Sequence, residues 1–241
     1  IALDRCYTLV QEMAEISTSS MKNVMELLTQ YDKQRAKEVR EAEEKCDHYE
    51  DILGTYLVKL SSYQMSDADS GIVSMMLKVI GDLERISDHS INILESAEEL
   101  REKKIQFTDE AKRELEVLCG AVSEIMTLSC TAFMQNDLDL SRNIEPLEQV
   151  IDDLKEAMRN AHVLRLKKGV CSIENGFIWL DLLTSLERAA DHCSNIAICI
   201  VDAAENSMNL HHSLSVMKEE SSYYKTQYAF YSEKYALPKI T

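Results

Sequence analysis

Glycine and proline are scarce in this sequence. Its 241 residues include only 6 glycines and 2 prolines, whereas a protein built from strands needs many turns and therefore more of both residues. Hydrophobic residues make up 45% of the chain and charged residues 28%, which is typical of a folded domain and not of a disordered one. The composition therefore favours long helices joined by short polar connections.

Closely spaced cysteines and long apolar runs are also missing. The 7 cysteines stand singly, without a Cys-x-x-Cys pair, so the sequence favours a reducing compartment over a disulfide framework or a thiolate zinc site. No continuous apolar run reaches the roughly 18 residues that a membrane span needs. The chain begins at Ile1 without a signal peptide or an initiating Met. We expect a processed form or a domain cut from a longer protein, in which membrane segments could precede it.

Basic residues are outnumbered by acidic ones. The chain has 26 lysine and arginine residues against 42 aspartate and glutamate residues, and its net charge is −16. A surface this acidic repels the phosphate backbone of nucleic acids and anionic lipid headgroups. We therefore expect no nucleic-acid partner, and expect cations or basic protein surfaces instead.

Apolar residues recur at helical spacing along most of the chain and predict seven helices. Pro146 should kink the fifth helix or mark its true start, because proline lacks a backbone donor, and Gly169 should end that helix. The expected helices cover about residues 1–31, 32–62, 67–104, 108–135, 137–168, 173–206 and 208–236. The expected N-capping residues are Asp32, Ser66, Thr108 and Asp137.

A repeat organises these helices. The segment Asp82–Ile93 lies 103 residues before Ser185–Ile196, and seven of the twelve aligned positions are identical. Upstream, Glu43–Asp47 matches Glu148–Asp152 at an offset of 105 residues. The same motifs in the same order at nearly the same offset indicate that a unit of three helices was duplicated.

The repeat predicts an all-α fold of two tandem three-helix bundles with an additional C-terminal helix. Residues 1–104 and 105–206 are expected to be the two copies, and residues 207–241 to carry the added helix. This last segment contains a stripe of tyrosines at helical spacing, which either packs on the bundles or forms a surface for a partner. The stripe consists of Tyr224, Tyr228, Tyr231 and Tyr235.

Each copy carries two pairs of carboxylates spaced four residues apart. Residues at this spacing lie on one face of a helix, and in an antiparallel bundle the second and third helices can bring their pairs together. Like charges at this spacing cost roughly 0.2–0.5 kcal/mol per pair, which a bound cation would offset. Oxygen ligands suit hard cations such as Mg²⁺, Mn²⁺, Ca²⁺ or ferric iron. The candidate ligands are Glu43, Asp47, Glu84 and Asp88 in the first copy and Glu148, Asp152, Glu187 and Asp191 in the second.

A different interpretation of these carboxylates stays open. Acidic side chains on bundle surfaces are often solvated, and Arg85 and Arg188 could neutralise them through neighbouring helices instead of a metal. His89 and His192 follow the third-helix motifs by one residue, about 100° round the helix, and we expect them to pair locally and not to bind the same ion. The sequence has no Glu-x-x-His motif, Gly-rich phosphate loop or nucleophile elbow, so no enzymatic activity is expected.

Two motifs each occur twice: Leu-Glu-Arg-x-x-Asp-His and, upstream of it, Glu-x-x-x-Asp. With these motifs the chain resembles the PhoU family. The resemblance covers about residues 1–206. It implies a pair of three-helix bundles whose motifs bind metal ions, often iron clusters, on the bundle surface. It assigns the metal most directly to Glu84, Asp88, Glu187 and Asp191. The tyrosine-rich segment and the missing initiating Met resemble the PhoU-like domain at the cytoplasmic C-terminus of bacterial sodium/phosphate cotransporters.

The sequence and this resemblance support three hypotheses about function. The first is a non-enzymatic, metal-binding regulatory domain of a phosphate transport protein, namely a sodium/phosphate cotransporter, in the cytoplasm at the inner face of the cell membrane. The second is a stand-alone PhoU-type negative regulator of a phosphate ABC transporter and its sensor kinase. The third is a structural helical dimerisation module without metal. The expected partners are accordingly the membrane portion of a transporter, on the same or another chain, or a second copy of this chain.

Overall fold

The computed structural model describes residues 2–205 and 213–238, and all regular structure in this part of the chain is helical. The predicted all-α fold is confirmed. Residues 206–212, where the expected seventh helix begins, lie outside the described residues. The helices are α1 (Ala2–Leu27), α2 (Lys33–Ser61), α3 (Asp67–Glu102), α4 (Asp109–Gln135), α5 (Leu138–Lys167), α6 (Ile173–Glu205) and α7 (Ser213–Lys234).

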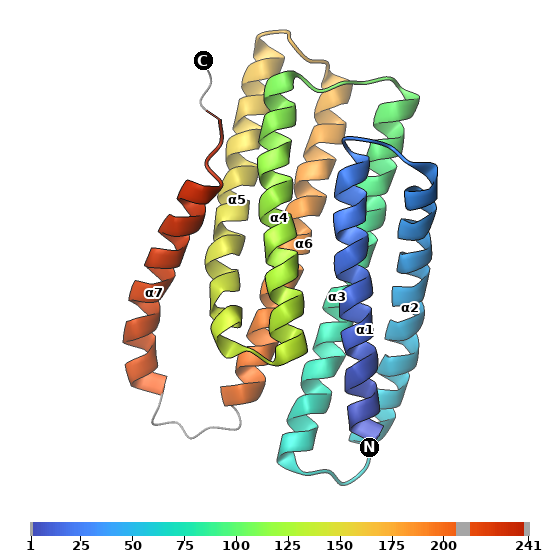
Figure 1. Cartoon of the computed structure of the whole chain (residues 1–241), viewed down its shortest axis with the longest axis vertical. Coiled ribbons are helices and arrows are strands. Elements are labelled where there is room, and N and C mark those ends of the chain that lie inside the picture. Colours follow the sequence, from blue (N-terminus) through green and yellow to red (C-terminus); the bar gives the residue numbers. More distant parts are fainter. Residues whose placement is uncertain (1, 206–212, 239–241) are drawn as a thin grey trace.

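Two three-helix bundles lie side by side (Figure 1). Helices α1, α2 and α3 pack against one another, as do α4, α5 and α6. Helix α3 of the first bundle and α6 of the second share the largest interface between helices, and α1 also contacts α4. Helix α7 lies along the outer flank of α5 (Figure 1). Two tandem bundles with an added C-terminal helix are therefore confirmed.

Polar side chains start the helices by satisfying their first backbone donors. At α2, the carboxylate of Asp32 accepts from the backbone N–H of Arg35 at 2.8 Å. Ser66, Thr108 and Asp137 cap α3, α4 and α5 in the same way. All four predicted N-caps are confirmed.

Helix α5 passes through a proline. It begins at Leu138 and contains Pro146, so the alternative that Pro146 marks the true start of the helix is wrong. The cap formed by Asp137 begins the helix more than two turns earlier. At the other end, Gly169 has a φ of +69°, and the N–H of Val170 bonds to the carbonyl oxygen of Arg165 at 3.2 Å, as expected for a glycine that ends a helix.

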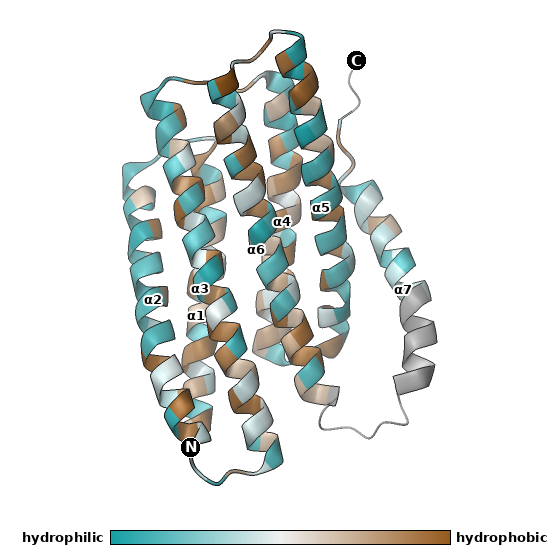
Figure 2. Ribbon diagram, turned by 180° about the vertical axis from the view of Figure 1, so that it is seen from behind, coloured by the Kyte–Doolittle hydropathy of each residue, from teal (hydrophilic) through white to brown (hydrophobic). Residues whose placement is uncertain are grey.

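Apolar side chains form one continuous core through both bundles. In Figure 2, hydrophobic and hydrophilic residues alternate round each helix, as expected for helices that bury one face. Trp179 of α6 is fully buried. Its ring meets the ring of Phe107 edge-on, with centroids 4.9 Å apart, so this tryptophan is a core residue.

The two bundles bury equivalent positions. Cys46 of α2 and Ile151 of α5, which differ by the offset of 105, are both buried, and so are Leu53 and Met158 one to two turns further on. The offset that aligns the two copies in the sequence therefore also aligns their buried residues. Equivalent residues of α2 and α5 can therefore be compared position by position.

Among the described residues, α4 alone is long and apolar enough by composition to cross a membrane. Its apolar stripe, however, packs into the core of the second bundle. It also carries the buried Glu114, whose two carboxylate oxygens accept from Arg165 of α5 at 2.9 and 3.0 Å. The apolar character of α4 is accounted for by this core.

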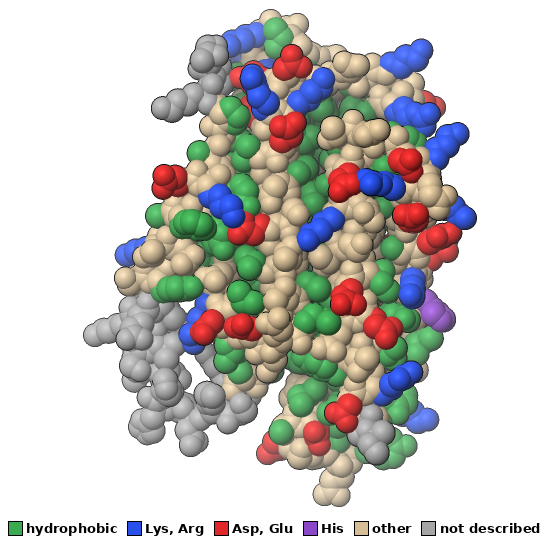
Figure 3. Space-filling view, in the orientation of Figure 1, with side chains coloured by type: hydrophobic (Ala, Val, Ile, Leu, Met, Phe, Trp, Pro, Cys, Tyr) green, Lys and Arg blue, Asp and Glu red, His purple; other side chains and the backbone are tan. Residues whose placement is uncertain are grey.

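Charged side chains of both signs are spread over the surface. Figure 3 shows the face on which α1 and α4 lie in front, where acidic and basic side chains alternate. Lys103, for example, lies 2.7 Å from both Glu99 and Glu174. Exposed pairs of this kind contribute at most about 1 kcal/mol each, so the buried core supplies most of the stability.

The tyrosine stripe fastens α7 to the second bundle. The side chain of Tyr231 is buried. The hydroxyl of Tyr228 donates to Asp153 of α5 at 2.5 Å, and that of Tyr235 donates to the carbonyl oxygen of Gly120 of α4 at 3.4 Å. Of the two alternatives for this stripe, packing on the bundles is the one observed.

Candidate metal centre

The carboxylates of α2 and α3 meet on the first bundle. Burial raises the pKa of Glu43, and the charges of Asp88 and Asp47 raise it further. Because Asp88 belongs to α3, the two helices bring their carboxylates within electrostatic range of each other. The first acidic set comprises Glu43, Asp47, Glu84 and Asp88, and the second acidic set comprises Glu148, Asp152, Glu187 and Asp191.

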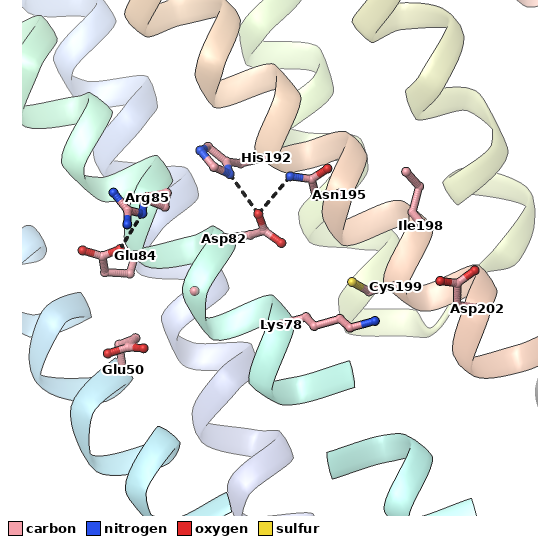
Figure 4. Close-up of a pocket in the computed structure, with 11 residues that line it drawn as sticks. Glu50, Lys78, Asp82, Glu84, Arg85, His192, Asn195, Ile198, Cys199 and Asp202 are labelled. Carbon is pink, nitrogen blue, oxygen red and sulfur yellow. Dashed lines mark hydrogen bonds and ion pairs between the residues drawn. The ribbon is translucent and has the colours of Figure 1, made fainter. Parts of the chain in front are cut away.

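Glu84 is a strongly perturbed carboxyl group of the first acidic set. Burial and the neighbouring Asp88 raise its pKa to about 7. The Nε of Arg85 lies 3.6 Å from its carboxylate, but the Arg85 side chain is 65% exposed, so water screens most of this attraction. Figure 4 shows Glu50 of α2 on the side facing Glu84, and the charge of Glu50 also raises the pKa of Glu84.

The second acidic set is arranged in the same way between α5 and α6. Burial and the charge of Asp191 raise the pKa of Glu148 to about 7, and Glu145 contributes to the rise. Asp191 in turn accepts a hydrogen bond from Arg188 at 3.0 Å. Arg188 lies on the same helix as Asp191 and its side chain is 58% exposed, so water screens most of this attraction, as it does for Arg85.

A lysine lies between the other two carboxylates of the second acidic set. The Nζ of Lys155 is 3.0 Å from Glu187 and 3.7 Å from Asp152. Lys155 was not predicted, because a single lysine on an amphipathic helix is usually solvated. Extending the alignment of the two copies by one helical turn beyond Asp152 finds it, opposite Glu50 of the first copy.

A groove of about 580 Å³ lies between α3 and α6 beside the first acidic set (Figure 4). On its wall, the Oδ1 of Asp82 lies 2.8 Å from the Nδ1 of His192 and accepts from the amide of Asn195 at 3.2 Å. The prediction that His192 pairs locally is therefore wrong, since its partner is a residue of the other copy. Asp82 was not predicted, since its partners lie on the other copy.

The chemistry of the two acidic sets fits a hard cation. All eight candidate ligands are carboxylates, the oxygen donors that such ions prefer. Close carboxylates with raised pKa values repel one another when both are ionised, and a cation would relieve this repulsion. As placed, however, no three His, Cys, Asp or Glu side chains in the described part of the chain form a group able to hold an ion. The assignment of these residues as metal ligands therefore stays a prediction.

The PhoU domain matches residues 10–97 and, a second time, residues 115–200. The chain belongs to the PhoU family. The phosphate-specific transport system accessory protein PhoU homolog 1 of Thermotoga maritima is 28% identical over 193 residues, covering 78% of this chain and 80% of the relative. The PhoU homolog of Pseudomonas aeruginosa, another accessory protein of this kind, is 25% identical over 215 residues, which cover 86% of each chain.

Solved PhoU structures have the same fold. The crystal structure of PhoU from Pseudomonas aeruginosa matches with a TM-score of 0.79 and 21% identity, covering 85% of this chain and 97% of that one. The phosphate transport system regulatory protein PhoU from Streptococcus pneumoniae matches with a TM-score of 0.73 and 20% identity, covering 84% and 94%. At these identities the likeness concerns the fold alone.

These PhoU relatives bear on the three functional hypotheses. Both sequence relatives are named as accessory proteins of phosphate-specific transport systems, and neither is named as a cotransporter. They therefore favour the stand-alone PhoU-type regulator over the domain of a sodium/phosphate cotransporter.

Proposed function

We propose that this PhoU-family chain is a non-enzymatic accessory protein that restrains a phosphate transport system from the cytoplasmic side of the membrane. Its acidic sets, in this proposal, hold a hard metal cation that assists docking to the transporter or its partners. The PhoU match over both bundles and the names of the relatives support the regulatory part.

The meeting of carboxylates from opposite helices carries the metal part of the proposal. Asp88 of α3 raises the pKa of Glu43 on α2, and Asp191 of α6 raises that of Glu148 on α5. Assembling like charges without a counter-ion costs folding free energy. When bound, a metal ion would neutralise these carboxylates and hold the two helices of each pair together.

Mn²⁺ binding to the full chain tests the metal part. After treatment with a chelator, the chain is titrated with Mn²⁺, and the free ion is followed by electron paramagnetic resonance. We expect Glu84→Ala combined with Asp88→Ala to lower the number of bound ions without loss of helix content. The matched control is Glu95→Ala with Glu99→Ala, which removes an acidic pair of the same spacing on α3 and should keep all ions. Full retention of Mn²⁺ after replacement of all eight carboxylates would refute the assignment of these residues as ligands, and absence of Mn²⁺ binding by the parent chain would favour a structural module without metal.

Phosphate uptake tests the regulatory part. Deletion of the gene for this chain in its native host should raise the uptake of labelled phosphate from phosphate-rich medium, and expression of the intact chain should restore the restrained rate. The variant that lacks all eight carboxylates should restore it poorly. Unchanged uptake after the deletion contradicts the restraining role.

Cell fractionation separates this proposal from the cotransporter hypothesis. An accessory protein that docks on a membrane transporter is released by a high-salt wash, because salt screens charged contacts. A cotransporter domain stays in the membrane fraction, since the same polypeptide would span the bilayer.

A further inference from the structure

One helical turn beyond Asp47 and Asp152, the two copies carry opposite charges. The offset of 105 that aligns Asp47 with Asp152 also aligns Glu50 with Lys155. The buried residues on either side keep the same register in α2 and α5, so Glu50 and Lys155 occupy the same place on their bundles. A negative charge in the first copy stands where the second copy has a positive charge.

In the second copy, a cation is already seated among the carboxylates. The ammonium group of Lys155 lies 3.0 Å from Glu187 of α6 and 3.7 Å from Asp152 of its own helix. The side chains of Lys155 and Glu187 are only 23% and 10% exposed, so water screens this pair much less than a surface pair. The carboxylates of this bundle thus bind a cation, and the chain itself supplies it.

In the first copy, the equivalent place holds another carboxylate. Glu50 on α2 lies on the side of Glu84 (Figure 4). The nearest cation to Glu84 in the described residues is Arg85, whose Nε is 3.6 Å away and whose side chain is largely exposed. At this position the first copy therefore has a carboxylate and lacks the built-in ammonium group of the second.

We propose that the two copies of the site take different cations: Lys155 occupies the Asp152 and Glu187 end of the second acidic set in place of a metal ion, whereas the corresponding end of the first set, where Glu50 stands in place of the lysine, is left for a metal ion. This inference rests on the proposed metal binding. It concerns this end of each set only, since Glu148 and Asp191 at the other end have no lysine partner in the described residues.

Exchange of the two residues tests the proposal. In the Mn²⁺ titration of the full chain, Lys155→Glu should bind one ion more than the parent chain, and Glu50→Lys one ion fewer. Lys155→Met should also gain an ion, because the ammonium group is gone while Asp152 and Glu187 remain. Lys167→Glu makes the same charge change at the exposed end of α5 and should leave the number of ions unchanged.

A second measurement does not depend on bound metal. In the presence of chelator, Glu50→Lys should raise the unfolding temperature of the chain, because the new ammonium group neutralises the first acidic set as Lys155 does the second. Lys155→Met should lower it.

The outcomes separate two failures. Mn²⁺ binding by the parent chain that neither exchange alters would overturn this inference and leave the proposed function intact. Absence of Mn²⁺ binding in the parent and in Lys155→Glu contradicts the proposed metal binding itself, and the inference with it.

Discussion

The imidazole rings of His89 and His192 stack on each other, with centroids 5.6 Å apart and planes 28° from parallel. The two histidines are equivalent in the duplication, so their contact marks a pseudo-two-fold relation between α3 and α6. Their hydrogen bonding differs. His192 pairs with Asp82, whereas the buried Nδ1 of His89 has no partner among the described residues, and the residue equivalent to Asp82 in the second copy is Ser185.

Replacement of Asp82 by serine should make the surroundings of His192 resemble those of His89. We expect Asp82→Ser to lower the free energy of unfolding by about 1–2 kcal/mol, because two hydrogen bonds to a carboxylate are lost. Urea denaturation measures this change. Asp202 lines the same groove and is exposed, so Asp202→Ser should change stability by less than about 0.5 kcal/mol. Equal effects of the two substitutions would count against the hydrogen bonds as the cause.

The buried His162 should make stability depend on pH. Its ring stacks on Trp179 with centroids 6.1 Å apart, and its Nε2 is buried without a partner in the described part of the chain. Burial lowers the pKa of His162, so as the pH falls below about 6.5 the unfolded chain takes up a proton that the folded chain resists. The contribution of this histidine to stability is therefore complete above that pH and is lost as the pH falls.

His162→Leu tests this pH dependence, because the equivalent residue of the first copy is Leu57. We expect the substitution to raise the free energy of unfolding more at about pH 5.5 than at about pH 8. Thermal unfolding at the two pH values measures the difference. The control His48→Leu changes an exposed histidine and should have the same effect at both. An effect of His162→Leu that is equal at both pH values refutes the explanation.

The buried pair of Glu114 and Arg165 should be sensitive to loss of one partner. Both side chains are 5% exposed, so Glu114→Ala leaves the buried guanidinium group with only the longer contact to Glu110 at 3.9 Å. We expect a loss of about 3–5 kcal/mol in the free energy of unfolding. Glu174→Ala breaks an exposed pair with Lys103 and should cost less than about 1 kcal/mol. A small effect of Glu114→Ala would mean that water reaches Arg165.

Docking of α7 should depend on Tyr231. Tyr231→Ala removes a buried ring and should weaken the docking of α7 by about 3 kcal/mol, while the two bundles keep their stability. Hydrogen exchange of the α7 amides measures this loosening. The adjacent Phe230 is 54% exposed, so Phe230→Ala should leave the exchange rates nearly unchanged. Similar exchange in the two variants would show that the tyrosine is not the anchor.

The helices of this protein could be predicted from the sequence because the signals that start and end them are local. Asp32 and Thr108, for example, cap the helices that follow them within three residues. The duplication predicted which helices belong to each bundle. The pairing of α3 with α6 was not predictable, because both faces of these helices carry apolar residues and periodicity does not say which face meets the other copy. The place of Pro146 inside α5 was likewise open, since a helix can pass through a proline.

The carboxylates of the candidate site could be predicted because they recur at a fixed spacing, whereas their neighbours could not. Lys155 was overlooked since a single lysine on an amphipathic helix is usually solvated, and only its distance from Glu187 shows its role. Asp82 pairs with His192, 110 residues away, a contact that depends on the docking of two bundles. Long-range polar contacts of this kind follow from tertiary packing and leave no periodic trace in the sequence.

The attachment of α7 to the second bundle has a consequence for recognition. A body built from two similar halves offers a binding protein two nearly interchangeable ways to approach it, one rotated by half a turn from the other. The helix that carries Tyr228 and Tyr231 covers a flank of one half. A protein that binds the side of this body therefore meets a different surface on each half. It can bind in a single orientation although the duplicated helices are alike.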